Sequence, residues 1–314
     1  MDVRVDDRLT DRLNIASARK RRYPFDDDVI DWSVPMSSDY VYMPEGSSFL
    51  HGTAVWERLS DTERSHVTRW EVTQILRNAG HGEHILNQGI LAMLWHTDPY
   101  EPAWRFMLHE VAEECQHMAM FNEWVRRNDD MRTWSIARGR RGTGAALLAQ
   151  LVAPRMPELF WVYVLLFEAV GDLVNDAFVR DRSDRLHPTL RQLMRAHRIE
   201  EARHIAFAVR WIENGVPKLS PARRWLLQRA TERTLLWLSR LPRLMPVAYS
   251  EQLAPYLSKE EFEAAVTDPR YTEHVGRHLQ PVAEVLIECG ALHPQRIAPG
   301  PDGRLIRLAG GVDA

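Results

Sequence analysis

Cysteine is nearly absent from this chain of 314 residues, in which only Cys115 and Cys289 occur. Two cysteines are too few for a disulfide framework, which indicates a reducing compartment. Long hydrophobic runs are also lacking, since no stretch of about 18 uncharged apolar residues could span a bilayer. The chain begins with Asp2, Asp6 and Asp7 in place of the apolar segment of a signal peptide. We therefore expect a cytoplasmic protein with no membrane partner.

An excess of charge of either sign is missing as well. The formal net charge is -3, and the isoelectric point calculated from the sequence is near 6.5. This balance creates no basic field that would attract nucleic acid, so we expect no nucleic-acid partner. The length, in contrast, is sufficient to bury a large hydrophobic core.

Capping residues and helical periodicity predict four long helices and several shorter ones. Ser60 and Glu63 have the spacing of a capping box and mark the start of the first long helix. Gly80 and Gly82 lie inside this helix and predict a bend or a π-bulge. The long helices are expected at about 61–95, 99–128, 158–181 and 188–215. Shorter helices are expected at about 145–151, 221–242 and 271–289, and one just after Ser258.

These helices predict an all-α fold, a ferritin-like four-helix bundle with extra helices and an extended N-terminal arm. Residues 1–58 show no sustained helical period, and we expect them to form the arm, which wraps the bundle and buries its scattered aromatic side chains. The helical domain is expected to span residues 59–292. Residues 293–314 are rich in glycine and proline and are expected to be coil, with room for one hairpin.

One segment of the fourth long helix carries three side chains typical of metal ligands. His197, Glu201 and His204 are spaced four and then three residues apart, so at about 100° per residue they share one helical face. The second helix repeats the Glu-x-x-His unit at Glu114 and His117. Two such units, with one glutamate from each of two other helices, form the ligand set of a carboxylate-bridged dinuclear metal site.

The two remaining glutamates are identified by their height along the bundle. In a hairpin of antiparallel helices, residues equally far from the connecting loop lie at one level. Glu83 is level with Glu114 by this rule, whereas Glu71 misses that level by roughly 18 Å. Glu168 is level with Glu201 and lies in the most apolar stretch, where an unpaired carboxylate costs several kcal/mol. The predicted metal ligands are therefore Glu83, Glu114, His117, Glu168, His197, Glu201 and His204.

Two further acidic residues are assigned supporting roles. Glu110 lies one turn before Glu114, as His197 lies one turn before Glu201, so we predict that Glu110 faces the same cavity, beside the ligands or as a proton relay. Asp172 is predicted to accept the second ring proton of a ligating histidine.

Each assignment has an ordinary alternative. A single Glu-x-x-His is often only a polar pair on an exposed helix. Glu83 follows a Gly-His-Gly segment, for which a surface position is the alternative, and the alternative for Asp172 is a salt bridge with a nearby arginine. Glu113 and Glu200 lie beside the ligand face and are expected to support the ligands or to form salt bridges.

Carboxylate and imidazole ligands favour iron or manganese over metals that prefer thiolates, and Cys115 is expected to point away from the ligand face. The order Glu…Glu-x-x-His…Glu…His-x-x-x-Glu-x-x-His, with the extra histidine His197, resembles the AurF family of di-iron N-oxygenases, whose members oxidise the amino group of p-aminobenzoate or related arylamines. The resemblance covers about residues 25–290, including segments 31–35 and 56–60. It implies that the seven residues bind two Fe ions, and that O₂ is the co-substrate for stepwise oxidation of an amine to hydroxylamine, nitroso or nitro products.

The resemblance also implies partners, namely a small-molecule amine substrate and an external electron donor. In the family a late arginine pairs with a substrate carboxylate, and Arg277 is the candidate here. For the oligomeric state, a homodimer is the common default. A ribonucleotide reductase small subunit fits less well, because its radical tyrosine typically stands four residues after the first ligand histidine, where this chain has Phe121. The alternative function is a ferritin-like di-metal protein of another class, either a C-hydroxylase or oxidase or a metal-binding protein without oxygenase activity.

Overall fold

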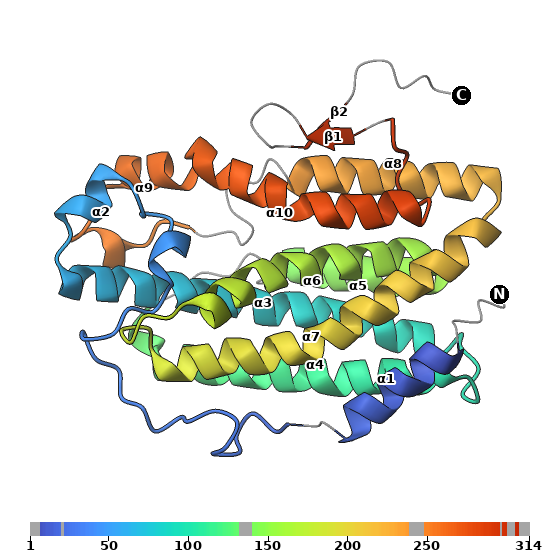
Figure 1. Ribbon diagram of the computed structural model, residues 1–314, viewed down its shortest axis with the longest axis horizontal. Helices are drawn as coiled ribbons and strands as arrows, with labels where there is room; N and C mark the ends of the chain where they lie inside the picture. Colours follow the sequence, from blue (N-terminus) through green and yellow to red (C-terminus); the bar gives the residue numbers. More distant parts are fainter. Residues whose placement is uncertain are drawn as a thin grey trace.

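Four long helices form the centre of the structure (Figure 1), a computed structural model that describes residues 7–19, 22–131, 140–238, 248–295, 297–299 and 305–307. They are α3 (Asp61–Leu94), α4 (Pro102–Arg127), α6 (Pro157–Arg180) and α7 (Pro188–Gly215). Short loops join α3 to α4 and α6 to α7, and each of these pairs packs over most of its length. The predicted ranges of the four helices are therefore confirmed to within a few residues.

A long connection joins the two helical hairpins. It contains the 3-10 turn Asp129–Met131 and helix α5 (Arg140–Arg155), which packs on α3 and α6. Two antiparallel hairpins with one long crossover form a ferritin-like bundle. The predicted all-α, ferritin-like fold is confirmed, although α5 is longer than the 145–151 expected.

Two local features of the first hairpin differ from the prediction. The α-helical geometry of α3 continues through Gly80 and Gly82 without a π-bulge. Gly82 instead permits close packing, since a Cβ there would lie 2.2 Å from Cζ of Phe167 on α6. Helix α4 begins at Pro102 and not at Pro99, because the residues around Asp98 form a turn and both prolines suit the first position of a helix.

The N-terminal region is more helical than predicted. Residues Asp7–Arg19 form α1, which packs on α4 and α7 where an extended arm was expected. The buried positions of α1 include the polar side chains of Thr10, Asn14 and Ser17, and Asn14 donates a hydrogen bond to the Pro102 carbonyl (3.0 Å). A helix that buries polar residues lacks the apolar period by which helices are found in a sequence.

The remainder of the arm follows the outside of the bundle, as predicted (Figure 1). Ile30 and Tyr42 are buried in one hydrophobic cluster with residues of α3, α4 and α7. Glu71, the glutamate rejected as a ligand, is fully buried and accepts hydrogen bonds from the Ser48 hydroxyl (2.9 Å) and the Phe49 amide (3.1 Å). Glu71 therefore anchors the arm to α3. The elements of the arm are the 3-10 turn Glu45–Ser47 and α2 (Ala54–Arg58).

Three helices and a hairpin follow the bundle, and α8 and α10 cover α6 (Figure 1). A 3-10 turn, Val216–Lys218, separates α7 from α8, and another, Glu251–Leu253, precedes α9. The predicted end of α8 near Pro242 falls outside the described residues. Within those residues, none of the helices has the length and hydropathy needed to cross a bilayer. The elements are α8 (Pro221–Leu238), α9 (Lys259–Val266), α10 (Pro269–Glu288), β1 (Ile297–Pro299) and β2 (Leu305–Arg307), which pairs antiparallel with β1.

Candidate metal centre

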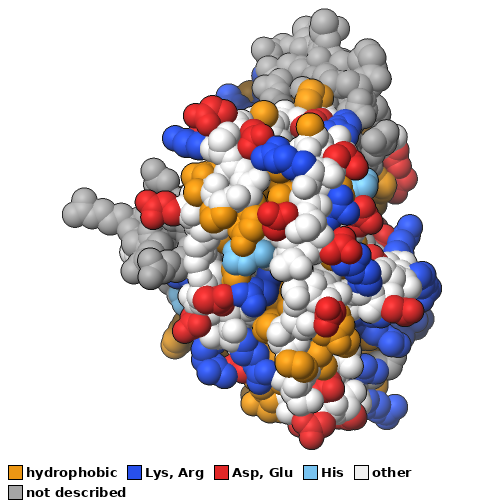
Figure 2. Space-filling view, turned by 90° about the vertical axis from the view of Figure 1, so that its left-hand side faces the viewer, with side chains coloured by type: hydrophobic (Ala, Val, Ile, Leu, Met, Phe, Trp, Pro, Cys, Tyr) orange, Lys and Arg blue, Asp and Glu red, His pale blue; other side chains and the backbone are white. Residues whose placement is uncertain are grey.

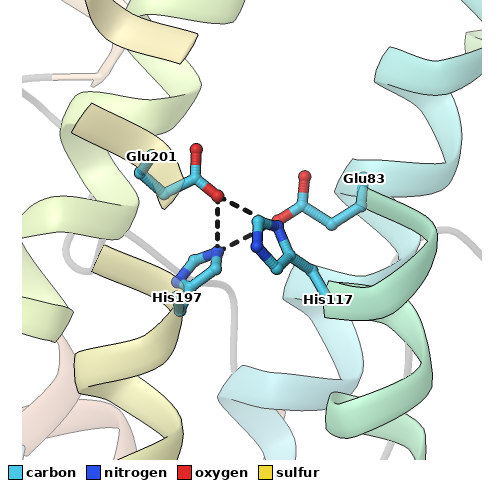
Figure 3. Close-up of side chains that lie close together, drawn as sticks. All are labelled: Glu83, His117, His197 and Glu201. Atoms are coloured by element: carbon cyan, nitrogen blue, oxygen red, sulfur yellow. Dashed lines mark ion pairs between the residues drawn. The ribbon is translucent and has the colours of Figure 1, made fainter. Parts of the chain in front are cut away.

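The seven predicted ligands meet in the centre of the bundle, at the middle of all four long helices. Each of these residues is 4% exposed or less. Figure 3 shows four of them directed at one another from α3, α4 and α7. The donor atoms form two groups, within each of which all atoms lie within 4.8 Å of one another: Glu83, His117, His197 and Glu201 in the first group, and Glu114, Glu168, Glu201 and His204 in the second.

Two glutamates face both groups. The Glu201 Oε1 atom lies 2.8 Å from His197 Nε2 and 3.0 Å from His117 Nδ1, whereas its Oε2 atom lies 3.0 Å from His204 Nδ1. Glu114 does the same, with Oε2 at 3.0 Å from His117 Nδ1 and Oε1 at 2.9 Å from His204 Nδ1. Carboxylates that present one oxygen to each of two positions have the geometry that bridges a pair of metal ions.

The donor set also fits two divalent cations in charge and chemistry. Glu83, Glu114, Glu168 and Glu201 carry four negative charges when ionised, equal to the positive charge of two divalent ions. Buried charges persist only when they are paired or bound to a metal. The Oε2 atom of Glu83 and the Oε1 atom of Glu168 are buried without a hydrogen-bond partner. A mixture of carboxylate and imidazole donors is suited to iron or manganese.

Without a metal, protons occupy several of these ligands. Burial, and then the charges of neighbouring glutamates, raise the pKa of Glu83 and of Glu168 well above the usual value. Burial would lower the pKa of His117 and His204, but the facing carboxylates Glu114 and Glu201 raise it well above the usual value. Those glutamates keep a low pKa despite burial, about 2 for Glu114, because of the nearby imidazoles. Metal ions would therefore displace protons from the cluster.

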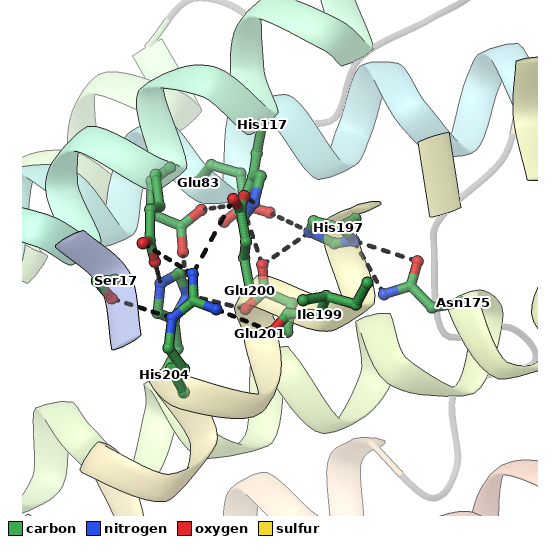
Figure 4. A network of polar contacts seen from close by, with 12 residues as sticks. Ser17, Glu83, His117, Asn175, His197, Ile199, Glu200, Glu201 and His204 are labelled. Carbon is green, nitrogen blue, oxygen red and sulfur yellow. Dashed lines mark hydrogen bonds and ion pairs between the residues drawn. The ribbon is translucent and has the colours of Figure 1, made fainter. Parts of the chain in front are cut away.

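The residue before each Glu-x-x-His glutamate orients the histidine of the opposite helix (Figure 4). Glu200 Oε2 lies 2.9 Å from His117 Nε2, and Glu113 Oε2 lies 2.9 Å from His204 Nε2. Each ring thus turns Nδ1 toward the cluster and donates from Nε2 to a carboxylate, the usual arrangement for metal-bound histidines. The sequence predicted only a general supporting role for Glu113 and Glu200.

Arg203 supplies the positive charge next to these two carboxylates. Its Nη2 atom lies 2.8 Å from Glu113 Oε1 and 4.0 Å from Glu200 Oε1, and its Nε donates to the Ser17 hydroxyl of α1 (3.0 Å). The Arg203 side chain is 8% exposed, so water screens its charge weakly. Arg203 was not predicted from the sequence, although its position between Glu201 and His204 indicates a side chain close to the ligands.

Arg203→Gln is expected to weaken metal binding by about 10- to 100-fold, the usual cost of losing a group that orients the ligands. Arg198→Gln is the matched control, because Arg198 is on the same helix but pairs with Asp172 (3.1 Å) and Asp176 (2.8 Å) away from the cluster. Calorimetric titration with Mn²⁺ measures the affinities. Equal affinities for the two variants would show that Arg203 does not support the ligands.

The prediction for Asp172 was wrong, because its carboxylate pairs with Arg198. The second ring nitrogen of His197, Nδ1, instead lies 2.9 Å from Asn175 Nδ2 and 3.1 Å from Asn175 Oδ1. A neutral ring whose Nε2 faces the cluster donates its proton from Nδ1, so the amide oxygen of Asn175 is the acceptor. Asn175 is 1% exposed and holds His197 in this orientation.

The other predicted residues have different outcomes. Glu110 is 1% exposed. Burial raises its pKa well above the usual value, although the nearby charge of His204 lowers it. This places Glu110 near the cluster, and its role as a proton relay stays a prediction. Arg277 lies in α10, but its side chain is outside the described part of the chain. Cys115 is exposed, which agrees with the prediction that it points away from the ligand face.

A family model described as P-aminobenzoate N-oxygenase AurF matches residues 4–290. The chain belongs to the AurF family. Membership agrees with the helical fold and supports a di-iron oxygenase of the N-oxygenase kind.

Curated relatives of this AurF-family protein include the uncharacterized proteins Mb0909 of Mycobacterium bovis and Rv0885 and MT0908 of two Mycobacterium tuberculosis strains. Each is 30% identical over 234 residues, which cover 72% of this chain. The matched region covers 66% of the length of these relatives. Their printed names assign no activity.

Proposed function

We propose that this AurF-family protein is a di-iron oxygenase that uses O₂ to oxidise the amino group of an arylamine-type small molecule toward hydroxylamine, nitroso or nitro products. The main support is the pair of donor groups bridged by Glu114 and Glu201. Two irons at these positions, held by the seven ligands, would supply two of the electrons needed to reduce O₂. An external electron donor, in the cytoplasm, would restore them.

The protein's own residues orient and shield such a centre. Glu113, Glu200 and Asn175 fix the three imidazole rings, and the four helices exclude water from the ligands. Burial strengthens the electrostatic interactions among the ligands and the bound ions. Phe121, whose ring lies 6.3 Å from that of His117, carries no phenol where a ribonucleotide reductase subunit would have its radical tyrosine.

The test is anaerobic reconstitution with Fe(II), followed by oxygen-18-labelled O₂ and a panel of arylamines. We expect products in which labelled oxygen is bonded to nitrogen, as identified by mass spectrometry. Label on carbon would identify a C-hydroxylase. Iron uptake far beyond two ions per chain, without product, would identify a storage protein.

His197→Ala is expected to lower the iron content toward one ion per chain and to leave the helices folded. The first donor group loses one of its two imidazoles, whereas the second group is unchanged. His96→Ala is a suitable control, since His96 is exposed just after the end of α3, about 20 Å along the helix axis from Glu83. Metal analysis and circular dichroism test the expectation. Unchanged iron content and turnover in His197→Ala would remove the case for a third histidine ligand.

A further inference from the structure

Aromatic side chains extend from the metal centre along α4 toward one end of the bundle. The ring of Phe121 lies 5.0 Å from that of His197 and 6.3 Å from that of His117. Trp124 follows one turn later and is fully buried. Its separation from His117, seven residues along one helix, is about 10 Å. A single electron can tunnel this distance through packed protein. The tunnelling rate is set mainly by the separation of donor and acceptor, and no covalent bond between them is needed.

Trp124 is in turn close to Tyr42 of the arm. Their ring centroids are 6.0 Å apart, and the ring of His187 lies 5.4 Å from Trp124 and 5.1 Å from Tyr42. Burial lowers the pKa of His187 to about 4, so this imidazole is neutral. The Trp124 indole donates a hydrogen bond from Nε1 to the hydroxyl oxygen of Thr73 (3.0 Å). Indole and phenol are among the side chains most easily oxidised by one electron, and here they are adjacent.

Tyr42 also lines a surface pocket at this end of the bundle, the end that faces the viewer in Figure 2. The pocket has a volume of about 190 Å³ and is open to solvent. Its other polar residues include Ser37, whose carbonyl accepts the Tyr42 hydroxyl (3.0 Å), and His66 and Arg69 of α3. Tyr42 thus lies between buried Trp124 and a pocket that is large enough for a small molecule.

We propose that Trp124 and Tyr42 form a one-electron relay, and that the pocket beside Tyr42 is where a small-molecule one-electron reductant docks. The proposal rests on the proposed function, which requires a supply of electrons, but it names residues and a surface that the function alone does not specify.

Each pass through the relay moves one electron toward the metal site, and Tyr42 loses and then recovers one proton. With an oxidised metal pair bound by the seven ligands, Trp124 would lose one electron to it and become a radical cation, whose Nε1 proton would stay hydrogen-bonded to Thr73. Tyr42, which is 1% exposed but borders the pocket, would then reduce Trp124 by one electron and lose its phenolic proton to a water molecule that enters the pocket. The docked reductant returns one electron to Tyr42, which recovers a proton from solvent. Two passes deliver the two electrons that a di-iron centre needs.

A second aromatic group on the other side of the centre lacks these features. Phe106, Phe207, Trp161 and Trp211 follow one another at centroid distances of 4.4, 4.9 and 5.7 Å, and Phe106 lies 6.5 Å from His204. The indole nitrogens of both tryptophans are buried without a hydrogen-bond partner. This group contains no tyrosine, so it has no phenol to connect it to solvent. Trp161 is therefore a matched control for Trp124, because it also lies seven residues from a predicted ligand, Glu168.

The experiment measures how fast the iron-loaded, air-oxidised protein is reduced. Ascorbate is added anaerobically as the one-electron probe, and iron(II) is followed with a colorimetric chelator. We expect Trp124→Phe and Tyr42→Phe to slow the reduction at least tenfold and Trp161→Phe to leave it unchanged, with equal iron content and helicity in all four proteins. Wild-type rates in Trp124→Phe, or equal losses in Trp161→Phe, would overturn the relay.

Electron paramagnetic resonance provides a second readout without an amine. Exposure of the Fe(II) protein to O₂ should produce an organic radical in the wild type that Trp124→Phe lacks, and Tyr42→Phe should retain only a tryptophan signal. A radical unaffected by either substitution would contradict the proposal. Both measurements are independent of amine oxidation, so a protein that fails to oxidise any amine but shows these effects would refute the proposed reaction and keep the relay.

Discussion

Glu201→Gln is expected to reduce the metal content from two ions per chain to one or fewer, the largest loss for any single substitution. Glu201 is the residue common to both donor groups, with one oxygen near His197 and His117 and the other near His204. An amide has one oxygen acceptor and no negative charge, so it cannot bridge two cations. Metal analysis after dialysis against Fe(II) or Mn²⁺ measures the stoichiometry.

Glu158→Gln is the control for this substitution. Glu158 is also a buried glutamate (2% exposed), but it lies at the start of α6, about 15 Å along the helix from Glu168. It should retain two ions per chain. Two tightly bound ions in Glu201→Gln would mean that another group bridges the metals.

Metal loading is expected to stabilise the protein more as pH rises from 5.5 to 8. The pKa values of Glu83, Glu168, His117 and His204 are raised in the folded, metal-free protein. Between the unfolded and the folded pKa of each group, the folded state therefore binds more protons than the unfolded state. The free energy of unfolding of the metal-free protein is highest below the unfolded pKa values and falls as pH rises through the folded ones. The lowered pKa of Glu114 and Glu201 affects stability only at more acid pH. Metal affinity should increase roughly tenfold per pH unit for each proton that binding releases.

Thermal unfolding with and without Mn²⁺ measures the difference between the two forms at each pH. Titration calorimetry in buffers of different ionisation enthalpy counts the released protons. A difference in unfolding temperature that is constant over this range, with no proton release, would show that the ligands are already deprotonated in the metal-free protein.

The convergence of the seven predicted ligands could be anticipated from the sequence because helix geometry is fixed. A rise of 1.5 Å per residue and short hairpin loops place Glu83 level with Glu114 and Glu168 level with Glu201. The hydrogen-bond partner of His197 could not be predicted from height along the bundle alone. Helical side chains lean toward the N-terminus of their helix, so on antiparallel helices His197 and Asn175 lean toward each other although their backbones are not level. Asp172, which is level with His197, pairs with Arg198 instead.

Other parts of the fold depend on tertiary contacts that no local pattern reveals. Helix α1 was missed because it buries Thr10, Asn14 and Ser17 against the bundle. The contact between Arg203 and Ser17, residues 186 positions apart in the chain, could not be inferred from either local sequence. Gly82 was predicted to mark a bend or a π-bulge, whereas the structure requires glycine there because the Phe167 ring of another helix packs against it.

The uneven distribution of the three histidines makes the two donor groups inequivalent. The first group has two imidazoles and two carboxylates, and the second has one imidazole and three carboxylates. Imidazole binds later first-row divalent ions more strongly than carboxylate does, so ions of different kinds would partition between the two positions. A protein given a mixture of manganese and iron would then assemble a mixed pair with a defined order. Its oxidation chemistry would depend on which element occupied each position.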